Sequence, residues 1–143
     1  MDMNRSIKDG FTLLELLVVL VILGLLISIA APNLFEQMRA AKRDTSAIQI
    51  ENLGASLDLY RLNVGRYPSQ DEGLNAMVKA PADAGSRWRG PYVKKEQYLT
   101  DPWGNFYAYT FPGKHNKKGY DLYSLGADGQ EGGDDDNQDI TNW

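Results

Sequence analysis

The residues best suited to chemistry in this sequence are carboxylates gathered near its carboxyl end. Asp128 is followed by Gly129, Glu131 and two further glycines, and then by three consecutive aspartates at 134–136. Calcium binds roughly six to eight carboxylate and carbonyl oxygens in flexible geometry, and glycines let a backbone fold back to offer its carbonyls. The pattern is compatible with a calcium loop. It is also compatible with a solvated acidic tail, which is what most runs of like charge form.

The spacing of these acids and the residue composition of the chain limit which metal ion the loop could bind. The acids of 128–136 do not alternate and the closing glutamate of an EF-hand is missing, so this is not an EF-hand loop. The sequence contains no cysteine, which excludes disulfides, zinc–thiolate centres and thiol catalysis. Clustered aspartate in a loop without cysteine favours a hard cation over zinc or copper.

A second carboxylate, Glu15, stands at the start of an apolar run in which residues 16–31 carry no charge. At about 1.5 Å per helical residue, residues 11–31 are long enough to cross the hydrocarbon core of a bilayer. A charge there costs roughly 2.5–3.5 kcal/mol at mid-depth, so it usually has a partner. The run contains no base. If the chain is cut between Gly10 and Phe11, the new ammonium group of one copy can pair with Glu15 of another.

Two other interpretations of the apolar run stay open at this point. Ser28-Ile29-Ala30 has the small-x-small pattern of a signal-peptide cleavage site, although the preceding region is barely basic and Glu15 stands where a signal peptide would be apolar. A plain membrane anchor is the other interpretation, and it leaves Glu15 without a partner.

Helical spacing continues beyond the apolar run. Pro32 lacks an N–H group and is expected to end or kink the membrane-spanning part. Apolar residues then recur three and four positions apart at Leu34, Met38 and Ala41, and the stripe continues at Ile50, Leu53, Leu57 and Tyr60. This periodicity predicts one long helix over about residues 11–62, whose second half packs on a globular body. A coiled coil is not favoured, because these positions do not hold a clean heptad.

The remaining residues predict a small mixed body. Ser69 and Glu72 have the spacing of a capping box, which predicts a short helix over about residues 70–79. Asp101-Pro102-Trp103-Gly104-Asn105 is a turn signature. The aromatic runs 106–111 and 120–125 predict a hairpin with a longer loop. The expected fold class is therefore α+β, with a long helix against a small antiparallel sheet.

The net charge argues against nucleic-acid binding, and the positions of the reactive side chains argue against catalysis. The formal net charge is −4 at pH 7, whereas a nucleic-acid binder needs a basic surface to neutralise phosphates. The single histidine, His115, lies in the expected hairpin loop, and Ser69 fits a helix cap better than a nucleophile. The sequence predicts neither a nucleic-acid-binding protein nor an enzyme.

The amino-terminal residues carry a resemblance to a known superfamily. Lys8-Asp9-Gly10-Phe11-Thr12-Leu13-Leu14-Glu15, followed by the apolar run, resembles the class III leader and transmembrane segment of type IV pilins and pseudopilins. Further motifs are similar to those of the major pseudopilins of the type II secretion system: Arg66-Tyr67-Pro68, Gly73-Leu74, 101–105, 120–129 and Asn142-Trp143. Together with the amino-terminal motif, the match covers nearly the whole chain.

The resemblance implies a division of the chain and a role for three residues. A prepilin peptidase would cut after Gly10 and N-methylate Phe11, and Glu15 would be the assembly residue. Residues 1–10 would be the leader, 11–32 the transmembrane and assembly helix, and 33–143 a periplasmic globular domain with the type IV pilin-like fold. Lysine and arginine counts on either side of the span favour the opposite membrane orientation, so the periplasmic placement rests on the resemblance.

The resemblance also implies a function and partners. The chain would be a structural subunit of the pseudopilus, a homopolymer that drives folded proteins across the outer membrane. Its partners would be minor pseudopilins, the prepilin peptidase, the inner-membrane secretion platform and inner-membrane lipid, with no nucleic acid. The alternatives are a type IV pilin or DNA-uptake pseudopilin, and a monomeric membrane-anchored calcium-binding protein.

Calcium is the cofactor that the resemblance implies. The family pattern would place the side chains of Asp128, Asp135 and Asp136 on the ion. The backbone carbonyls of Leu125, Gln130 and Gly133 would complete the site, and the ion would tie the carboxyl-terminal segment onto the sheet.

Overall fold

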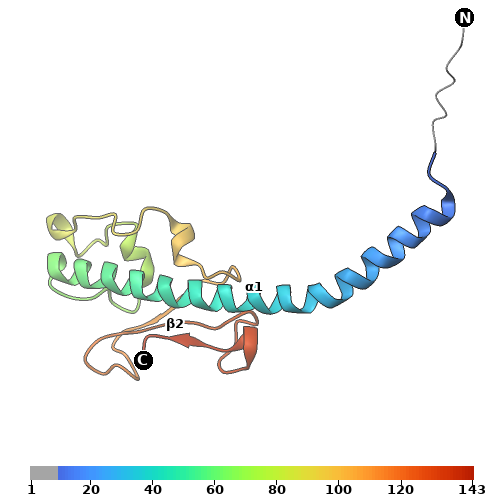
Figure 1. The fold of residues 1–143 in the computed structure, drawn as a ribbon. Helices are drawn as coiled ribbons and strands as arrows, with labels where there is room; N and C mark the ends of the chain where they lie inside the picture. The colour runs from blue at the N-terminus through green and yellow to red at the C-terminus, as the bar shows by residue number, and fades with distance from the viewer. Residues whose placement is uncertain (1–9) are drawn as a thin grey trace, which may run out of the picture. The chain divides into compact units, whose positions relative to one another are not determined.

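The computed structural model describes residues 10–143, so the predicted leader lies outside the described residues except for Gly10. One long helix, α1, precedes three short strands, β1 to β3, and short 3₁₀ helices lie between them (Figure 1). The chain divides into two compact units, one ending at Met38 and one formed by Arg39–Trp143. The second unit, with its helix and sheet, confirms the predicted α+β class.

Helix α1 spans Leu13–Val64, two residues later at each end than predicted. It ends because Gly65 adopts a left-handed backbone with φ of 92° and donates its N–H to the Arg61 carbonyl at 2.8 Å. Pro32 lies inside the helix, which agrees with the single long helix predicted over about residues 11–62; of the two expectations for Pro32, ending the membrane-spanning part is not what the structure has. A proline inside a helix removes one backbone donor, and the hydrogen bonds of the turns on either side carry the helix past it.

The buried face of α1 forms the centre of the second unit. Leu57 and Tyr60 are completely buried, and Ile50, Leu53 and Val64 are nearly so. These residues repeat at helical spacing and pack against the strands and the loops that follow. The prediction for Ile50 to Tyr60 is confirmed, whereas Leu34 and Met38 are more than half exposed and do not join this core.

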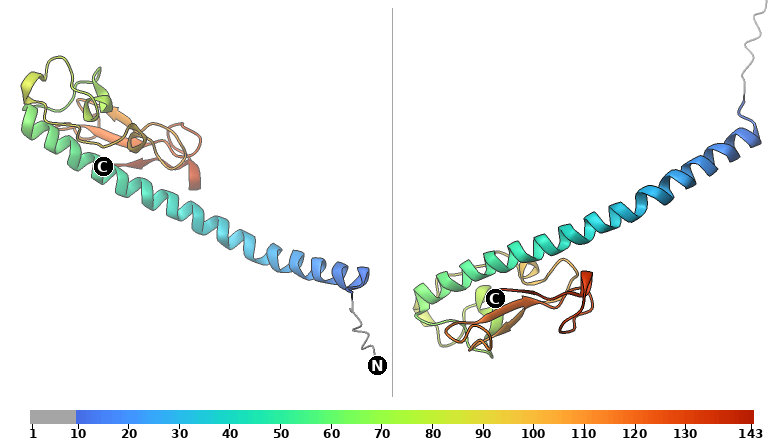
Figure 2. Two further views of the ribbon diagram at one scale, coloured as in Figure 1. Left: turned by 90° about the horizontal axis from the view of Figure 1, so that it is seen from above. Right: turned by 60° about the horizontal axis from the view of Figure 1, so that its bottom comes forward.

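The sheet lies along the second half of α1 (Figure 2). Strands β1 (Ala108–Thr110) and β2 (Asp121–Ser124) pair antiparallel, which confirms the predicted hairpin. A third strand that was not predicted, β3 (Ile140–Thr141), pairs antiparallel with β2. The sheet order is β1-β2-β3, so the acidic segment 128–139 is the connection between the two paired strands β2 and β3.

The loop between β1 and β2 is held by a buried carboxylate. Asp121 accepts backbone hydrogen bonds from Lys114, His115 and Asn116 at 2.7–2.9 Å. Burial raises the pKa of Asp121, but these donors outweigh burial and leave the pKa below its usual value. His115 is half exposed in this loop and stacks on Trp143 at 4.0 Å between ring centroids, so its role here is packing.

The predicted helix over 70–79 is wrong in type and length. The segment forms a short 3₁₀ helix over Gly73–Met77, because Gly73 has a φ of 53°, which an α-helix cannot contain. The capping box itself is present: the Ser69 N–H donates to Glu72, and the Glu72 N–H donates to the Ser69 hydroxyl. Glu72 also receives two bonds from Arg66 at 2.6 and 2.7 Å.

Candidate functional site

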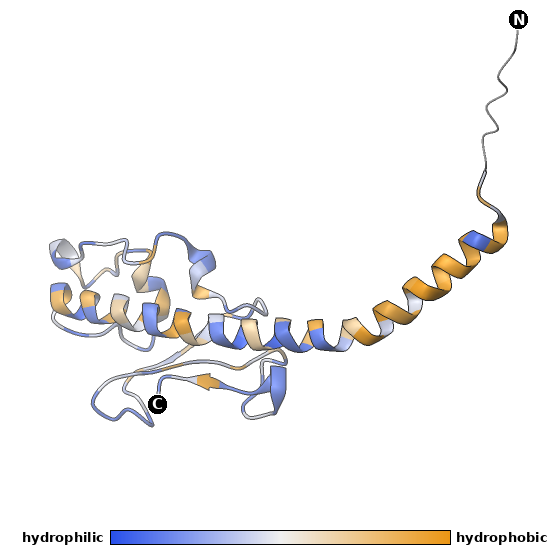
Figure 3. Ribbon diagram, viewed as in Figure 1, coloured by the Kyte–Doolittle hydropathy of each residue, from blue (hydrophilic) through white to orange (hydrophobic). Residues whose placement is uncertain are grey.

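The first candidate site is the apolar start of α1. The helix contains a stretch with a mean hydropathy of 3.0, none of it buried against the rest of the described chain. The large aliphatic residues between Leu13 and Ile29 are all more than 45% exposed, and Figure 3 shows this part of α1 as almost continuously hydrophobic. An apolar surface of this size needs lipid or other apolar helices around it.

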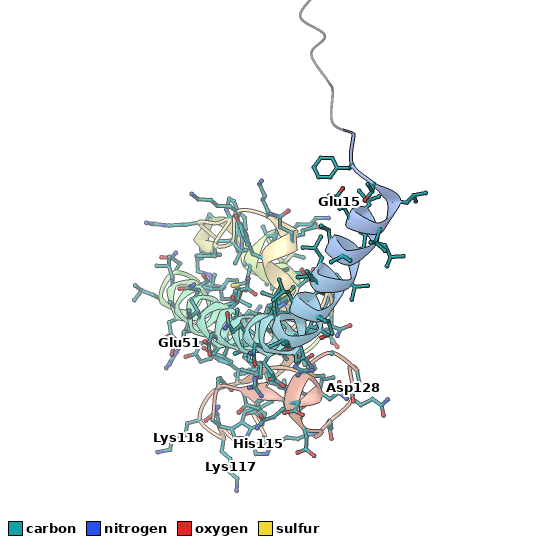
Figure 4. All side chains as sticks on the ribbon, turned by 45° about the vertical axis from the view of Figure 1, so that its right-hand side comes forward. Glu15, Glu51, His115, Lys117, Lys118 and Asp128 are labelled. Carbon is teal, nitrogen blue, oxygen red and sulfur yellow. The ribbon has the colours of Figure 1, made fainter. Side chains whose placement is uncertain are left out.

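Glu15 is held in a defined place at the helix start. Thr12 donates its backbone N–H and its hydroxyl to Oε2 of Glu15 at 2.8 and 3.0 Å, and the Glu15 N–H donates back to the Thr12 hydroxyl at 3.2 Å. This reciprocal arrangement is a capping box. It positions the carboxylate on the amino-terminal turn, as labelled in Figure 4, where the helix dipole favours a negative charge.

This capping box was not predicted, although Thr-x-x-Glu is its usual sequence pattern. The sequence interpretation gives this carboxylate no partner within its own chain, whereas Thr12 provides it with two hydrogen bonds. Hydrogen bonds do not neutralise the charge, and the sequence offers no lysine or arginine from Phe11 to Met38. Glu15 therefore still lacks an opposite charge along the apolar part of α1.

The second candidate site is the acidic loop, 128–139, whose start is fixed by buried polar contacts. The Ser124 hydroxyl donates to Asp101, and the Gly126 N–H donates to the Ser124 hydroxyl at 3.1 Å. Asn105 donates its side-chain amide to the Gly126 carbonyl at 2.9 Å. The predicted turn 101–105 therefore serves as the support on which the loop begins.

Contacts within the loop bring its two ends together. The Ala127 N–H donates to the Asp136 carbonyl at 2.8 Å, and the Gly132 N–H donates to Oδ2 of Asp139 at 2.9 Å. A short 3₁₀ helix covers Asp135–Asn137. A side chain added at Gly126 would meet the Asp136 carbonyl at 2.7 Å, so only glycine permits this close approach.

The predicted calcium ligands of this loop differ in their burial and in their hydrogen bonds. Asp128 is exposed, is labelled in Figure 4, and accepts a bond from the Gln130 N–H at 3.1 Å. Oδ1 of Asp136 is buried without a hydrogen-bond partner. The Asp135 carbonyl lies 3.5 Å from the Arg43 guanidinium. Across residues 10–143, no three aspartate, glutamate or histidine side chains gather closely enough to hold a metal ion.

Asp139 is a functional candidate that the sequence interpretation omitted. Its Oδ1 atom, like that of Asp136, is buried and has no hydrogen-bond partner. Buried carboxylate oxygens are normally paired, and unpaired ones fit a hard cation that prefers oxygen ligands. The signal that could have found Asp139 is its position directly before β3, but that strand was not predicted.

Comparisons with known proteins decide the family. The family model for the type II secretion system, protein G, matches residues 33–143, and the prokaryotic N-terminal methylation motif matches residues 5–31. The chain belongs to the protein G family of type II secretion, the major pseudopilins. This is a family of structural proteins, which confirms that the chain is not an enzyme.

Relatives in the protein G family cover almost the whole chain. The type II secretion system core protein G of Pseudomonas aeruginosa is 44% identical over 144 residues, covering 99% of each chain. That of Vibrio cholerae is 44% identical over 138 residues, covering 95% of this chain and 92% of the relative. The expected resemblance to major pseudopilins is therefore confirmed.

A solved structure shows the same fold. The crystal structure of the major pseudopilin from the type 2 secretion system of enterohaemorrhagic Escherichia coli matches with a TM-score of 0.61 and 33% identity. The match covers 78% of this chain and 95% of that chain. The pilin-like α+β fold, a long helix packed on a small antiparallel sheet, is confirmed by this match.

Proposed function

We propose that the chain, a major pseudopilin, is cut between Gly10 and Phe11 by a prepilin peptidase, N-methylated at Phe11 and polymerised through residues 11–32. The methylation motif matched over 5–31 supports the processing step. The observation that carries the assembly step is the apolar first part of α1, none of which is buried against the rest of the described chain. Polymerisation buries this surface against the same segment of other copies, after the span has left the inner-membrane lipid.

Glu15 has a specific part in this proposal. Both Thr12 donors reach Oε2, so Oε1 is the oxygen proposed to receive the Phe11 amine of a neighbouring copy. The pair removes the cost of an isolated charge among apolar helices. Because the amine exists only after cleavage at Gly10, the precursor cannot form the pair, and processing becomes the condition for assembly.

The proposal places the globular domain, 33–143, in the periplasm and the span in the inner membrane. The filament grows on the inner-membrane secretion platform together with minor pseudopilins. Its growth pushes folded proteins toward the outer membrane. The energy for filament growth is proposed to come from the platform.

Calcium is proposed as the ligand of the acidic loop. The side chains of Asp128, Asp135 and Asp136 and the carbonyls of Leu125, Gln130 and Gly133 would hold it. The unpaired buried oxygen of Asp139 supports adding that residue to the set. When bound, the ion supplies positive charge to a cluster of like charges. It thereby stabilises the connection between β2 and β3 and couples metal binding to folding of the loop.

The test of the assembly step replaces the Glu15 carboxylate. Glu15→Leu should leave cleavage after Gly10 intact but strongly reduce filaments formed by overproduced protein and the secretion of folded proteins. Glu96→Leu, at an exposed position of the globular domain, is the control and should assemble normally. Normal filaments from the Glu15 variant would overturn the proposed role.

The test of the calcium site is a thermal melt of the wild-type protein. Saturating calcium at about one hundred times the dissociation constant should add about 2.7 kcal/mol to the free energy of unfolding. Addition of a chelator should remove that gain. Identical melting temperatures with calcium and with chelator would reject calcium as the ligand.

A further inference from the structure

The sheet has an outer face, which points away from the core, and three side chains meet on it. Tyr109 and Leu122 are buried in the core, and side chains alternate between the two faces along a strand. Their neighbours Thr110 and Tyr123 therefore lie on the outer face. The ring of Trp143, just beyond β3, lies 5.5 Å from that of Tyr123 between centroids. Thr110, Tyr123 and Trp143 together line a cavity of about 300 Å³.

Two loops form the walls of this cavity. Lys114 and His115, the latter labelled in Figure 4, come from the loop between β1 and β2, and Glu131 and Asp139 come from the acidic loop. The two loops adjoin opposite ends of β2, so the cavity lies between them. We call it the outer pocket. Its volume is at the lower end of the range for ligand pockets, roughly 300–1,000 Å³, which leaves room for one small ring.

The aromatic rings of the outer pocket are held in place by one another. The His115 ring stacks on Trp143 at 4.0 Å between centroids with an interplanar angle of 6°, and Tyr123 meets Trp143 edge-on at 72°. The Thr141 hydroxyl donates to the Trp143 carbonyl at 3.0 Å. Trp143 is nevertheless 48% exposed, so it is open to a ligand. Rings that are already ordered lose little conformational freedom when a ligand binds.

The polar groups of the outer pocket carry both signs of charge. Lys114 and Glu131 are exposed and line the pocket from opposite walls. Asp121, which also lines it, is already hydrogen-bonded to the backbone of its own loop, and Asp139 is among the proposed calcium ligands. Lys114 would repel a cationic ligand and Glu131 an anionic one. A neutral ligand with several hydroxyl groups suits both, because a hydroxyl can donate to a carboxylate and accept from an ammonium group.

We propose that the outer pocket binds one ring of a neutral saccharide. The C–H groups on one face of a sugar ring pack against Tyr123 and Trp143, since the faces of aromatic rings are apolar and slightly negative. The hydroxyl groups at the edge of the sugar bond to Glu131 and Lys114. Saccharide binding goes beyond the proposed function and does not depend on polymerisation. Only the choice of glycan rests on that function, because a domain in the periplasm meets the N-acetylhexosamine chains of the cell wall.

Saturation-transfer NMR of the full chain tests the proposal. The protein is held in a detergent without a sugar headgroup, with calcium present so that the acidic loop is ordered. The probes are chitotriose, a trisaccharide of N-acetylglucosamine, and cellotriose, which has the same linkage without the acetamido groups. Transfer to chitotriose alone supports a cell-wall glycan as the ligand, and transfer to both supports a site for neutral saccharides in general. Transfer to neither overturns the proposal.

Aromatic variants show whether the transfer arises in the outer pocket. Trp143→Ala should weaken chitotriose binding about tenfold, whereas Trp143→Phe keeps a ring and should retain most of it. Tyr98→Ala is the matched control, because Tyr98 is an aromatic residue of similar exposure, 45%, outside the outer pocket. Unchanged binding in Trp143→Ala, or an equal loss in Tyr98→Ala, would overturn the assignment.

Variants of the walls keep the test sharp even if Trp143→Ala fails to fold. Lys114→Ala and Glu131→Ala change exposed side chains, so the melting temperature should not fall, but each should weaken chitotriose binding several-fold. Lys117→Ala lies in the same loop as Lys114 without lining the outer pocket and should bind as the wild type does. Equal losses at 114 and 117 would overturn the proposal. A wild-type chain that forms filaments but binds neither saccharide would remove the outer pocket and leave the proposed function standing.

Discussion

Oδ2 of Asp101 accepts a 2.5 Å hydrogen bond from the hydroxyl of Ser124, and both residues are buried. Oδ1 of the same carboxylate accepts the backbone N–H groups of Trp103 and Asn105 at 3.0 and 2.9 Å. One carboxylate therefore closes the turn 101–105 and also fixes the end of β2, from which the acidic loop starts.

Asp101→Ala should destabilise the globular domain by about 3 kcal/mol, because it leaves buried donors without an acceptor. It should also weaken the stabilisation by calcium, since the Gly126 end of the loop loses its support. Thermal melting with and without calcium measures both effects. Asp101→Asn, which keeps one acceptor oxygen, is the control and should lose less; an unchanged melt for the alanine variant would disprove the role of this contact.

The Arg66–Glu72 pair predicts a pH dependence of stability. Hydrogen bonds from Arg66 lower the pKa of Glu72 from 4.5 to about 2 in the folded protein. Because the folded value lies below the unfolded one, the stabilisation is complete above pH 4.5 and is lost as the pH falls toward about 2.

Glu72→Gln should therefore lower the melting temperature at pH 7, by the equivalent of about 1–2 kcal/mol. The difference from the wild type should shrink between pH 4.5 and 2 and disappear at the acid end. Melting curves across this range test the prediction. A difference that stays constant down to pH 2 would show that the carboxylate charge is not the cause.

The unpaired oxygens of Asp136 and Asp139 predict which acids matter for the metal. Asp136→Asn and Asp139→Asn should each abolish most of the calcium-dependent rise in melting temperature. Asp134→Asn should retain it, because that residue is not among the proposed ligands and has no buried unpaired oxygen of the kind found at Asp136 and Asp139. Calcium titration followed by calorimetry measures the affinities. Equal losses in all three variants would mean that overall charge, and not ligation, produces the effect.

Gly126 and Gly129 form a matched pair for testing closure of the acidic loop. Both have a φ of 66°, so alanine is strained at either position. Of the two positions, only Gly126 would bring an added Cβ into collision with the far end of the loop, 2.7 Å from the Asp136 carbonyl. At Gly129 the nearest atom is 3.9 Å away.

Gly126→Ala should therefore lower both stability and calcium affinity well beyond Gly129→Ala, whose effect should be that of backbone strain alone. Melting curves and calcium titrations of the two variants measure this difference. Equal effects would show that the Ala127–Asp136 closure does not shape the metal site.

The sequence predicted the elements whose signals are local. Helical periodicity from Ile50 to Tyr60 identified the buried face of α1, and alternating aromatic residues identified the β1–β2 hairpin. The processing motif around Gly10 and Phe11 identified the superfamily. Each of these features depends on residues that are close in the chain.

Features that depend on distant residues were missed. Strand β3 has only two residues and exists because β2 offers it an edge, so neither the strand nor Asp139 before it could be recognised. The helix predicted over 70–79 was wrong because the backbone at Gly73 overrides a correct capping signal.

The central claim is that processing exposes the amine that Glu15 requires, and mass spectrometry of the native amino terminus tests it most directly. The account predicts a mature chain that begins at N-methylated Phe11 in protein recovered from functioning cells. A chain that still carries residues 1–10 and nevertheless supports filaments and secretion would contradict it.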